Sequence, residues 1–133
     1  HGYPTELAEQ FAVVAWCKRL SRTVEPALDL LFAVPNGAKR DHQEATIKLM
    51  EGMRKGVPDL WVPAPRKGFH GLVIEMKVGV WPGAHAPKPV VSTEQHSYLG
   101  ALRKEGYFAV VCCGADAAKQ TIREYFGFEG DPV

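Results

Sequence analysis

The sequence predicts an α/β protein with a mixed central sheet flanked by helices, and three apolar runs indicate this fold class. Residues 60–63 and 72–77 are short apolar runs bounded by turn residues, as buried strands are. A third run, "YFAVVCC", follows a helical pattern at residues 92–106. Strands joined through a helix are usually parallel with a right-handed crossover, so we expect the second and third runs to pair in parallel.

The first helix is predicted to begin after Thr5. This residue can cap the helix, and glutamates occupy the first turns, where the helix dipole favours negative charge. Leu7, Phe11, Val14 and Leu20 recur at helical spacing, as the apolar face of an amphipathic helix does.

The next segment leads to the first strand. "EPALDLLFAV" predicts a short helical turn followed by an extended "LLFAV", and "PNGAKR" has the residues of a turn. Residues 41–56 predict a second amphipathic helix, which Gly56 and Pro58 stop.

The remaining elements follow from the same signals. "APRKGFHG" predicts a hairpin between the first two strands, and the Pro- and Gly-rich "VGVWPGAHAPKPVV" predicts a loop. Ser92 or Thr93 can cap the third helix, and Gly106 ends it. "GADAAKQTIREYFGF" predicts a last helix, so the predicted order is α, α, β, β, α, β, α.

Length and composition fit one globular domain that covers residues 1–133. The hydrophobic content of 46% and the charged content of 23% are ordinary for such a domain, and no run is long enough to cross a membrane. Three cysteines without a C-x-x-C motif argue against a disulfide framework or a zinc site, and favour a reducing cytoplasm. The net charge of +1 does not by itself indicate a nucleic-acid binder.

Charged residues occur where the predicted strand ends should be apolar. Asp59 precedes the first strand, and Glu75 and Lys77 close the second, two residues apart and therefore on one face. Because a hairpin returns beside itself, Asp59 can share that space. Two converging carboxylates, with the Met76 carbonyl and waters, form a site for a hard divalent cation. A lysine there can hold a nucleophilic water or neutralise a phosphate, which suits phosphodiester hydrolysis.

The plain alternative is an exposed ion pair between Glu75 and Lys77 on an edge strand, with Asp59 as a turn residue. A bare E-x-K favours that alternative. The combination of Pro58-Asp59 with Glu75-Met76-Lys77, at the ends of apolar runs, instead resembles the PD-(D/E)xK nuclease signature.

Further segments resemble, in order, the VRR-NUC family, the virus-type replication-repair nuclease branch of that superfamily. They are "ELAEQ", "VPNGAKR", "GMRKGVPDLWV", "GLVIEMK", "STEQHSYLGALRKEGYFAVVCCG" and "AAKQTIREYF". The resemblance covers about residues 5–127 and points to the stand-alone, phage-type members. It implies a restriction-endonuclease-like fold with an α-β-β-β-α-β core, and a single VRR-NUC-type domain.

The resemblance also implies an activity. Stand-alone members are homodimeric, Mg²⁺- or Mn²⁺-dependent, structure-selective endonucleases that cut branched DNA, with four-way (Holliday) junctions as substrate. A four-way junction is nearly two-fold symmetric, so a two-fold homodimer with two active sites supplies the paired nicks. The implied setting is DNA repair in the cytoplasm of a bacterial or phage-infected cell, with no membrane partner.

Site residues carry over from the family motifs. Asp59 and Glu75 match the metal-ligating carboxylates, and Lys77 matches the catalytic lysine. The family also has a first-helix glutamate near a glutamine. Glu6 and Glu9 compete for this role, and Glu6 is favoured because it shares a helix face with Gln10. The alternative for either is a first-turn carboxylate that only the helix dipole favours.

Other candidates are weaker. Gln95 matches a family glutamine at the start of the third helix, where it can bond the lysine or a phosphate or simply cap the helix. Trp81 can be a stacking wedge or, as we favour, an anchor for its loop. The near-zero net charge requires the basic residues of a DNA-binding face to gather beside the active site. The DNA-binding candidates are Asn36, Lys39, Arg40, Lys55, Arg66 and Lys67.

Three other functions remain open. A flap endonuclease or a restriction-like endonuclease would use the same residues, although no recognition domain is visible for sequence-specific readout. A non-catalytic DNA-binding module that recruits other factors is the third. An intact Asp59, Glu75 and Lys77 set argues against that module, because binding alone does not need carboxylates that repel phosphate.

Overall fold

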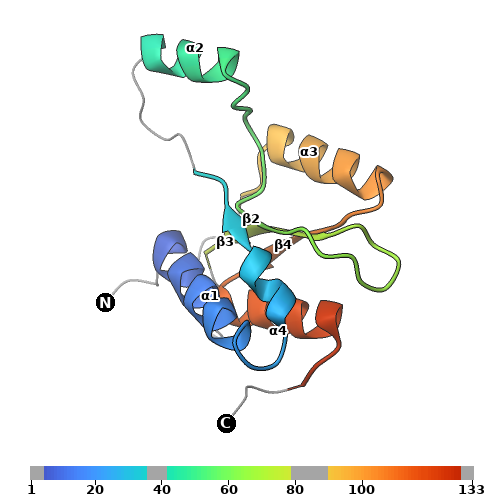
Figure 1. Cartoon of the computed structure of the whole chain (residues 1–133). Coiled ribbons are helices and arrows are strands. Elements are labelled where there is room, and N and C mark those ends of the chain that lie inside the picture. Colours follow the sequence, from blue (N-terminus) through green and yellow to red (C-terminus); the bar gives the residue numbers. More distant parts are fainter. Residues whose placement is uncertain (1–4, 36–41, 79–89, 130–133) are drawn as a thin grey trace.

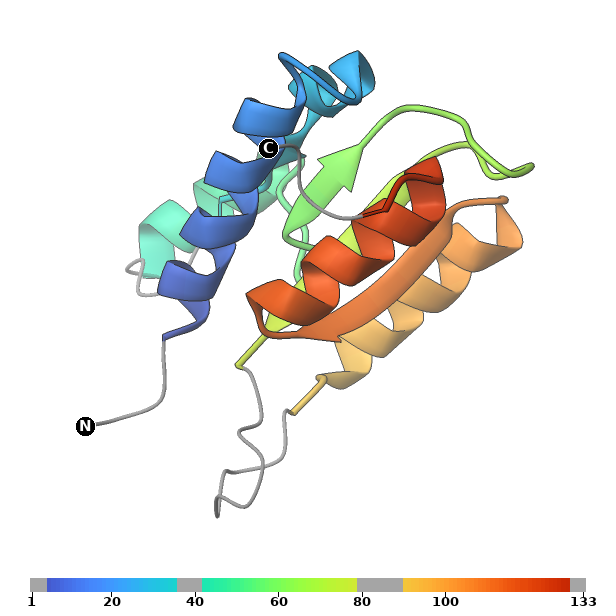
Figure 2. The same cartoon turned by 90° about the horizontal axis from the view of Figure 1, so that it is seen from below.

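The computed structural model describes residues 5–35, 42–78 and 90–129. Figures 1 and 2 show a three-layer arrangement in which a sheet lies between two helices on one face and one helix on the other. The fold is therefore α/β with a mixed central sheet, as the sequence predicts.

The sheet has four strands in the order β1-β2-β3-β4. The first three strands pair antiparallel, whereas β3 and β4 pair in parallel through a helical connection, which confirms the prediction. The sequence interpretation treated the segment before residue 35 as extended but did not count a strand there. The strands are β1 (Phe32–Ala33), β2 (Leu60–Val62), β3 (Leu72–Lys77) and β4 (Phe108–Cys113).

Helices α1 and α4 cover one face of the sheet, and α3 covers the other (Figure 2). Their ends follow the predicted capping residues. Thr5 caps α1 through its hydroxyl, and Ser92 forms a capping box with Gln95 at the start of α3. The helical elements are α1 (Glu6–Leu20), η1 (Pro26–Leu30), α2 (His42–Met50), α3 (Thr93–Lys104) and α4 (Ala115–Phe126).

Strand β3 is central and buried on both faces, which explains its continuous apolar run. Alternate residues point to opposite layers. Leu72 and Ile74 join the larger core under α1 and α4, and Val73 joins the smaller core under α3. Glu75 and Lys77 continue the Val73 series, so their side chains reach the layer that contains α3.

The predicted apolar face of α1 is wrong in its first two turns. The side chains of Leu7 and Phe11 are 59% and 63% exposed, and the buried positions are Val13, Trp16, Cys17 and Leu20. Helix α1 is apolar around much of its circumference, so periodicity alone could not choose the face that meets the sheet.

Helix α2 is shorter than predicted. It ends at Met50 instead of running to residue 56, because Gly52 takes a φ of +107° and Gly56 a φ of +84° in the segment that follows. Figure 1 shows α2 standing apart from the layers. Among the described residues, α2 packs against no other helix or strand.

None of the helices in the described part of the chain combines the length and the hydropathy of a membrane span.

Candidate active site

The register of the β2–β3 hairpin places the two predicted carboxylates side by side. Leu60 pairs with Ile74, so the residue before Leu60 lies opposite the residue after Ile74. These residues are Asp59 and Glu75. The antiparallel pairing thus brings together two groups that are far apart in the sequence, at the end of the sheet where β2 begins and β3 ends.

A third carboxylate reaches the same point from α1. Oxygen atoms of Glu6, Asp59 and Glu75 all lie within 4.8 Å of one another. Glu6 is half-buried, Asp59 is 9% exposed and Glu75 is 2% exposed. Three acidic side chains in such a small, poorly hydrated volume repel one another unless protons or cations offset their charge.

The orientation of Asp59 is set by backbone contacts. Its Oδ2 accepts a hydrogen bond from the Met76 amide at 2.7 Å, and its carbonyl accepts one from the Val34 amide at 2.8 Å. The Met76 peptide was predicted to offer its carbonyl to a metal, and that role stays a prediction. What the structure adds is the amide, which holds the carboxylate in place.

Glu75 lies in an environment that favours its protonated form. Burial, together with the hydrogen bond and the charge of the adjacent Asp59, raises the pKa of Glu75 to about 8, although the charge of Lys77 opposes the shift. Burial also raises the pKa of Glu6, again with a contribution from Asp59. Glu75 Oε1 is buried and has no hydrogen-bond partner among the described residues.

Gln95 connects the lysine to the carboxylates. Its Oε1 accepts hydrogen bonds from Lys77 Nζ at 3.0 Å and from the Ser92 amide at 2.9 Å, and its Nε2 donates to Glu75 Oε2 at 3.2 Å. Lys77 Nζ lies 3.8 Å from Glu75 Oε2 and its side chain is only 12% exposed. Both roles considered for Gln95, helix cap and lysine partner, therefore occur in one side chain.

Glu9 does not join the acidic cluster. Its Oε2 accepts a hydrogen bond from the Ala115 amide at the start of α4, where Gly114 offers no side chain to cap that helix. The structure thus separates the two competing glutamates: Glu6 points to Asp59 and Glu75, and Glu9 links α1 to α4.

The donor set fits a hard divalent cation. Mg²⁺ and Mn²⁺ prefer oxygen ligands, and Glu6, Asp59 and Glu75 offer only carboxylate oxygens. The unpartnered Glu75 Oε1 is available as a ligand atom, and a cation would offset the burial and the repulsion from Asp59 that raise the pKa of Glu75. These three residues are the ones that can hold the metal.

A pocket of about 520 Å³ opens beside Asp59, Glu75 and Gln95. Its other walls come from the end of β1, from α2 with the turn after it, and from α3. Lys55, a predicted DNA-binding residue, lines this pocket. The pocket is large enough to admit part of a nucleotide chain to the carboxylates.

Gly56 holds the pocket wall against α3. A Cβ at this position would meet the Glu94 carbonyl atoms at 2.5 Å and the Gln95 amide nitrogen at 2.8 Å. Only glycine allows the two backbones to approach this closely, and its φ of +84° also suits glycine. The sequence interpretation took Gly56 as a helix stop and missed this role.

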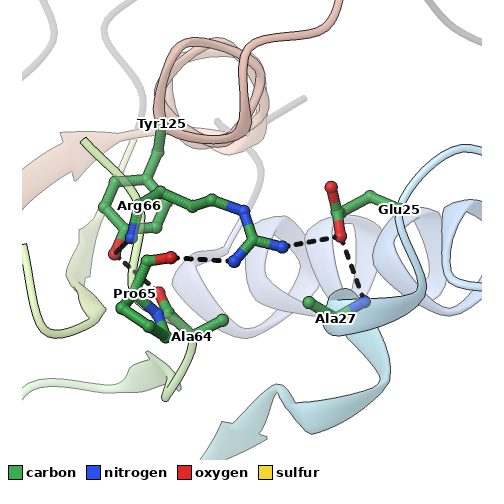
Figure 3. A network of polar contacts seen from close by, with 6 residues as sticks. All are labelled: Glu25, Ala27, Ala64, Pro65, Arg66 and Tyr125. Atoms are coloured by element: carbon green, nitrogen blue, oxygen red, sulfur yellow. Dashed lines mark hydrogen bonds and ion pairs between the residues drawn. The ribbon is translucent and has the colours of Figure 1, made fainter.

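The structure does not bring Arg66 and Lys67 to the site. Both lie in the connection between β2 and β3, at the opposite end of these strands from Asp59 and Glu75. Figure 3 shows the Arg66 guanidinium bonded to Glu25 and to the Pro65 carbonyl. Lys67 Nζ donates to the Glu124 carbonyl. The expectation that both belong to the active-site face is therefore corrected: they tie the connection to neighbouring elements.

The same network includes Tyr125, whose hydroxyl donates to the Ala64 carbonyl at 2.7 Å and accepts from the Arg66 amide at 3.2 Å (Figure 3).

Three predicted DNA-binding residues, Asn36, Lys39 and Arg40, lie outside the described residues, as does Trp81.

Two site residues escaped the sequence interpretation in addition to Gly56. Tyr98 and Arg54 line the pocket, and the Arg54 guanidinium carbon lies 5.0 Å from the centre of the Tyr98 ring. Tyr98 follows Gln95 by three residues, which places both on one face of α3. That spacing was a signal the sequence already contained.

Comparison with known proteins agrees with this fold. A solved structure named "VRR_NUC domain protein" is similar to this chain with a TM-score of 0.75 and 29% sequence identity. The match covers 100% of this chain and 99% of that chain. No protein-family model and no curated protein matches the sequence.

The α/β fold, with two carboxylates and a lysine at the end of its central strands, defines a domain of the nuclease type. The similarity over the whole chain then makes the comparison specific. This chain is similar along its full length to a VRR_NUC domain protein, which supports the resemblance to the VRR-NUC family found in the sequence.

Proposed function

We propose that this protein is a Mg²⁺- or Mn²⁺-dependent DNA endonuclease that hydrolyses phosphodiester bonds in branched DNA. The observation that carries the proposal is the convergence of Glu6, Asp59 and Glu75 within 4.8 Å, with the Lys77 ammonium 3.8 Å from Glu75. Two or more carboxylates beside a lysine suit metal-assisted phosphodiester hydrolysis. The alternative, an exposed ion pair between Glu75 and Lys77, does not explain why both side chains are largely buried.

The side chains have distinct roles in this proposal. Glu6, Asp59 and Glu75 hold the metal, which when bound polarises the phosphate and stabilises the charge that develops on it. Lys77 orients the attacking water or neutralises a phosphate oxygen. Gln95 keeps the ammonium in position, because its Oε1 accepts from Lys77 while its Nε2 binds Glu75.

We further propose a four-way junction as substrate and a two-fold homodimer as the active form. This part rests on the sequence motifs shared with stand-alone VRR-NUC proteins and on the symmetry of the substrate. Sedimentation at micromolar concentration should show a dimer, and a strict monomer would contradict the paired-nick scheme.

The test is a cleavage assay with Mg²⁺ or Mn²⁺ on a four-way junction, a flap, a splayed arm and a linear duplex. Lys77→Ala should reduce the cleavage rate at least 100-fold and leave junction binding intact. Lys104→Ala, an exposed lysine in the last turn of α3, is the matched control and should cut normally.

Each outcome is informative. Symmetric, metal-dependent nicks on the junction alone would support a junction resolvase. Cutting of flaps or duplex would retain the nuclease and change its substrate. Binding without cutting in any metal would refute the enzyme and favour a recruitment module. Unchanged turnover in Lys77→Ala would remove this lysine from the mechanism.

A further inference from the structure

A second pocket lies next to the active-site pocket along the outer face of α3. Its volume is about 460 Å³, and it shares Arg54, Lys55 and Tyr98 with the first pocket. The two pockets therefore adjoin at these three residues, so a DNA strand that leaves the carboxylates can pass over them into the second pocket.

The shared wall has the chemistry of a base-stacking platform. Tyr98 is half-buried, and the exposed Arg54 lies with its guanidinium carbon 5.0 Å from the Tyr98 ring centre. Aromatic rings and guanidinium groups are the planar surfaces on which proteins stack unpaired bases. Lys55 beside them supplies a positive charge for the backbone that connects successive bases.

The lining of the second pocket suits a base better than a phosphate. Glu94 and Glu105 carry negative charge that repels phosphate. Thr93 and Ser97 offer hydroxyls that can donate to or accept from the edge of a base, and Leu102 adds apolar contact.

We propose that the second pocket holds a nucleobase of the strand that passes through the active site, stacked on the Tyr98 and Arg54 pair. This inference rests on the proposed function. Because a base inside a duplex is already stacked and paired, only an unpaired base can enter. The pocket would thus select DNA that is single-stranded or frayed beside the phosphate that is cut.

The experiment measures binding, so that it does not depend on cleavage. Single-stranded oligonucleotides carry one 2-aminopurine at successive positions, and binding is followed by fluorescence with Ca²⁺ in place of Mg²⁺. Stacking on the protein should quench the probe at one position. Tyr98→Leu should abolish that quenching and weaken binding about 10-fold to 100-fold, whereas Tyr98→Phe, which keeps the ring, should bind normally.

Tyr107→Leu is the matched control, because it removes another half-buried tyrosine ring, one that contacts Trp61 and His70 instead of either pocket. Arg54→Gln, at an exposed position, tests the same platform if Tyr98→Leu does not fold. Quenching and affinity that are unchanged in Tyr98→Leu, or in Arg54→Gln if only that variant folds, would overturn the proposal.

The failure of this inference can be told apart from failure of the proposed function. Metal-dependent cleavage that is unchanged in Tyr98→Leu would be consistent with the nuclease function and would refute the base pocket. Tyr98-dependent quenching in a protein that cuts no DNA would retain the pocket and refute the enzyme.

Discussion

Glu6 and Glu9 lie one turn apart on α1, yet they have different partners. Glu6 joins Asp59 and Glu75, whereas Glu9 accepts a hydrogen bond from the Ala115 amide at the start of α4. The helix dipole favours both first-turn glutamates, yet Glu6 belongs to the candidate metal site and Glu9 stabilises the packing of α1 against α4.

This division predicts opposite effects for one chemical change. Glu6→Ala should lower Mn²⁺ affinity at least 10-fold with little loss of stability, because it removes one ligand of the metal. Glu9→Ala should retain Mn²⁺ affinity and cost about 0.5–2 kcal/mol of unfolding free energy, because the Ala115 amide loses its acceptor as it would on the loss of a helix cap. Calorimetric titration with Mn²⁺ and urea denaturation measure the two effects, and the reverse pattern would contradict the assignment.

Glu75 makes the stability of the metal-free protein depend on pH. Its pKa is about 8 in the folded protein and near the ordinary value of 4.5 in the unfolded chain. Between these values the folded state holds the extra proton, so the free energy of unfolding falls as pH rises from about 4.5 to about 8.

Urea denaturation in EDTA at pH 5 and pH 8 should therefore show a loss of a few kcal/mol in the wild type. Glu75→Gln, which stays neutral, should lose much less over the same range. Equal pH dependence in both proteins would show that Glu75 does not carry the extra proton.

At the scale of elements, the site depends on how closely the segment after α2 approaches α3. Gly56 lets that segment contact the first turn of α3 at the backbone of Glu94 and Gln95. Gln95 in turn binds Lys77 and Glu75 of β3. The contact at Gly56 therefore links the segment after α2 to α3 and, through Gln95, to β3.

Gly56→Ala should be more destabilising than Gly68→Ala. Both glycines have a φ of +84°, so the backbone strain of an alanine is comparable, but an alanine Cβ at residue 68 meets nothing within 4 Å. The added clash at residue 56 should cost roughly 1–3 kcal/mol beyond the strain. Urea denaturation compares the stability of the two variants. Equal losses of unfolding free energy would mean that α3 can move away from the added Cβ without destabilising the protein.

At the scale of the whole molecule, the net charge is +1, so DNA binding depends on where the basic groups lie. Lys55 lines both pockets, whereas Lys67 lies at the other end of the β2 and β3 strands and donates to the Glu124 carbonyl. In the proposed function, the charge distribution matters more than the total charge, because Lys55 faces the DNA and Lys67 does not.

This separation can be measured as a salt dependence. Lys55→Ala should reduce the slope of log affinity against log salt by about one, because one phosphate contact is lost. Lys67→Ala should leave the slope unchanged. A reduced slope in Lys67→Ala would show that the opposite end of the sheet also contacts DNA.

The sequence by itself determined the order of the elements apart from the short strand β1, the parallel pairing of the last two strands and the residues of the nuclease signature. These features are local or nearly so: caps, turns and apolar runs depend on neighbours in the chain, and two residues on one strand share a face for geometric reasons. Asp59, Glu75 and Lys77 were recognisable because their charges interrupt apolar runs.

Only the tertiary structure decided which face of α1 is buried, which of Glu6 and Glu9 joins the cluster, and which basic residues lie beside the site. Arg66 and Lys67 have the same local composition as Arg54 and Lys55, and only the path of the chain sends one pair to Glu25 and Glu124 and the other to the pocket. These outcomes depend on packing between segments far apart in the sequence, which no local pattern encodes.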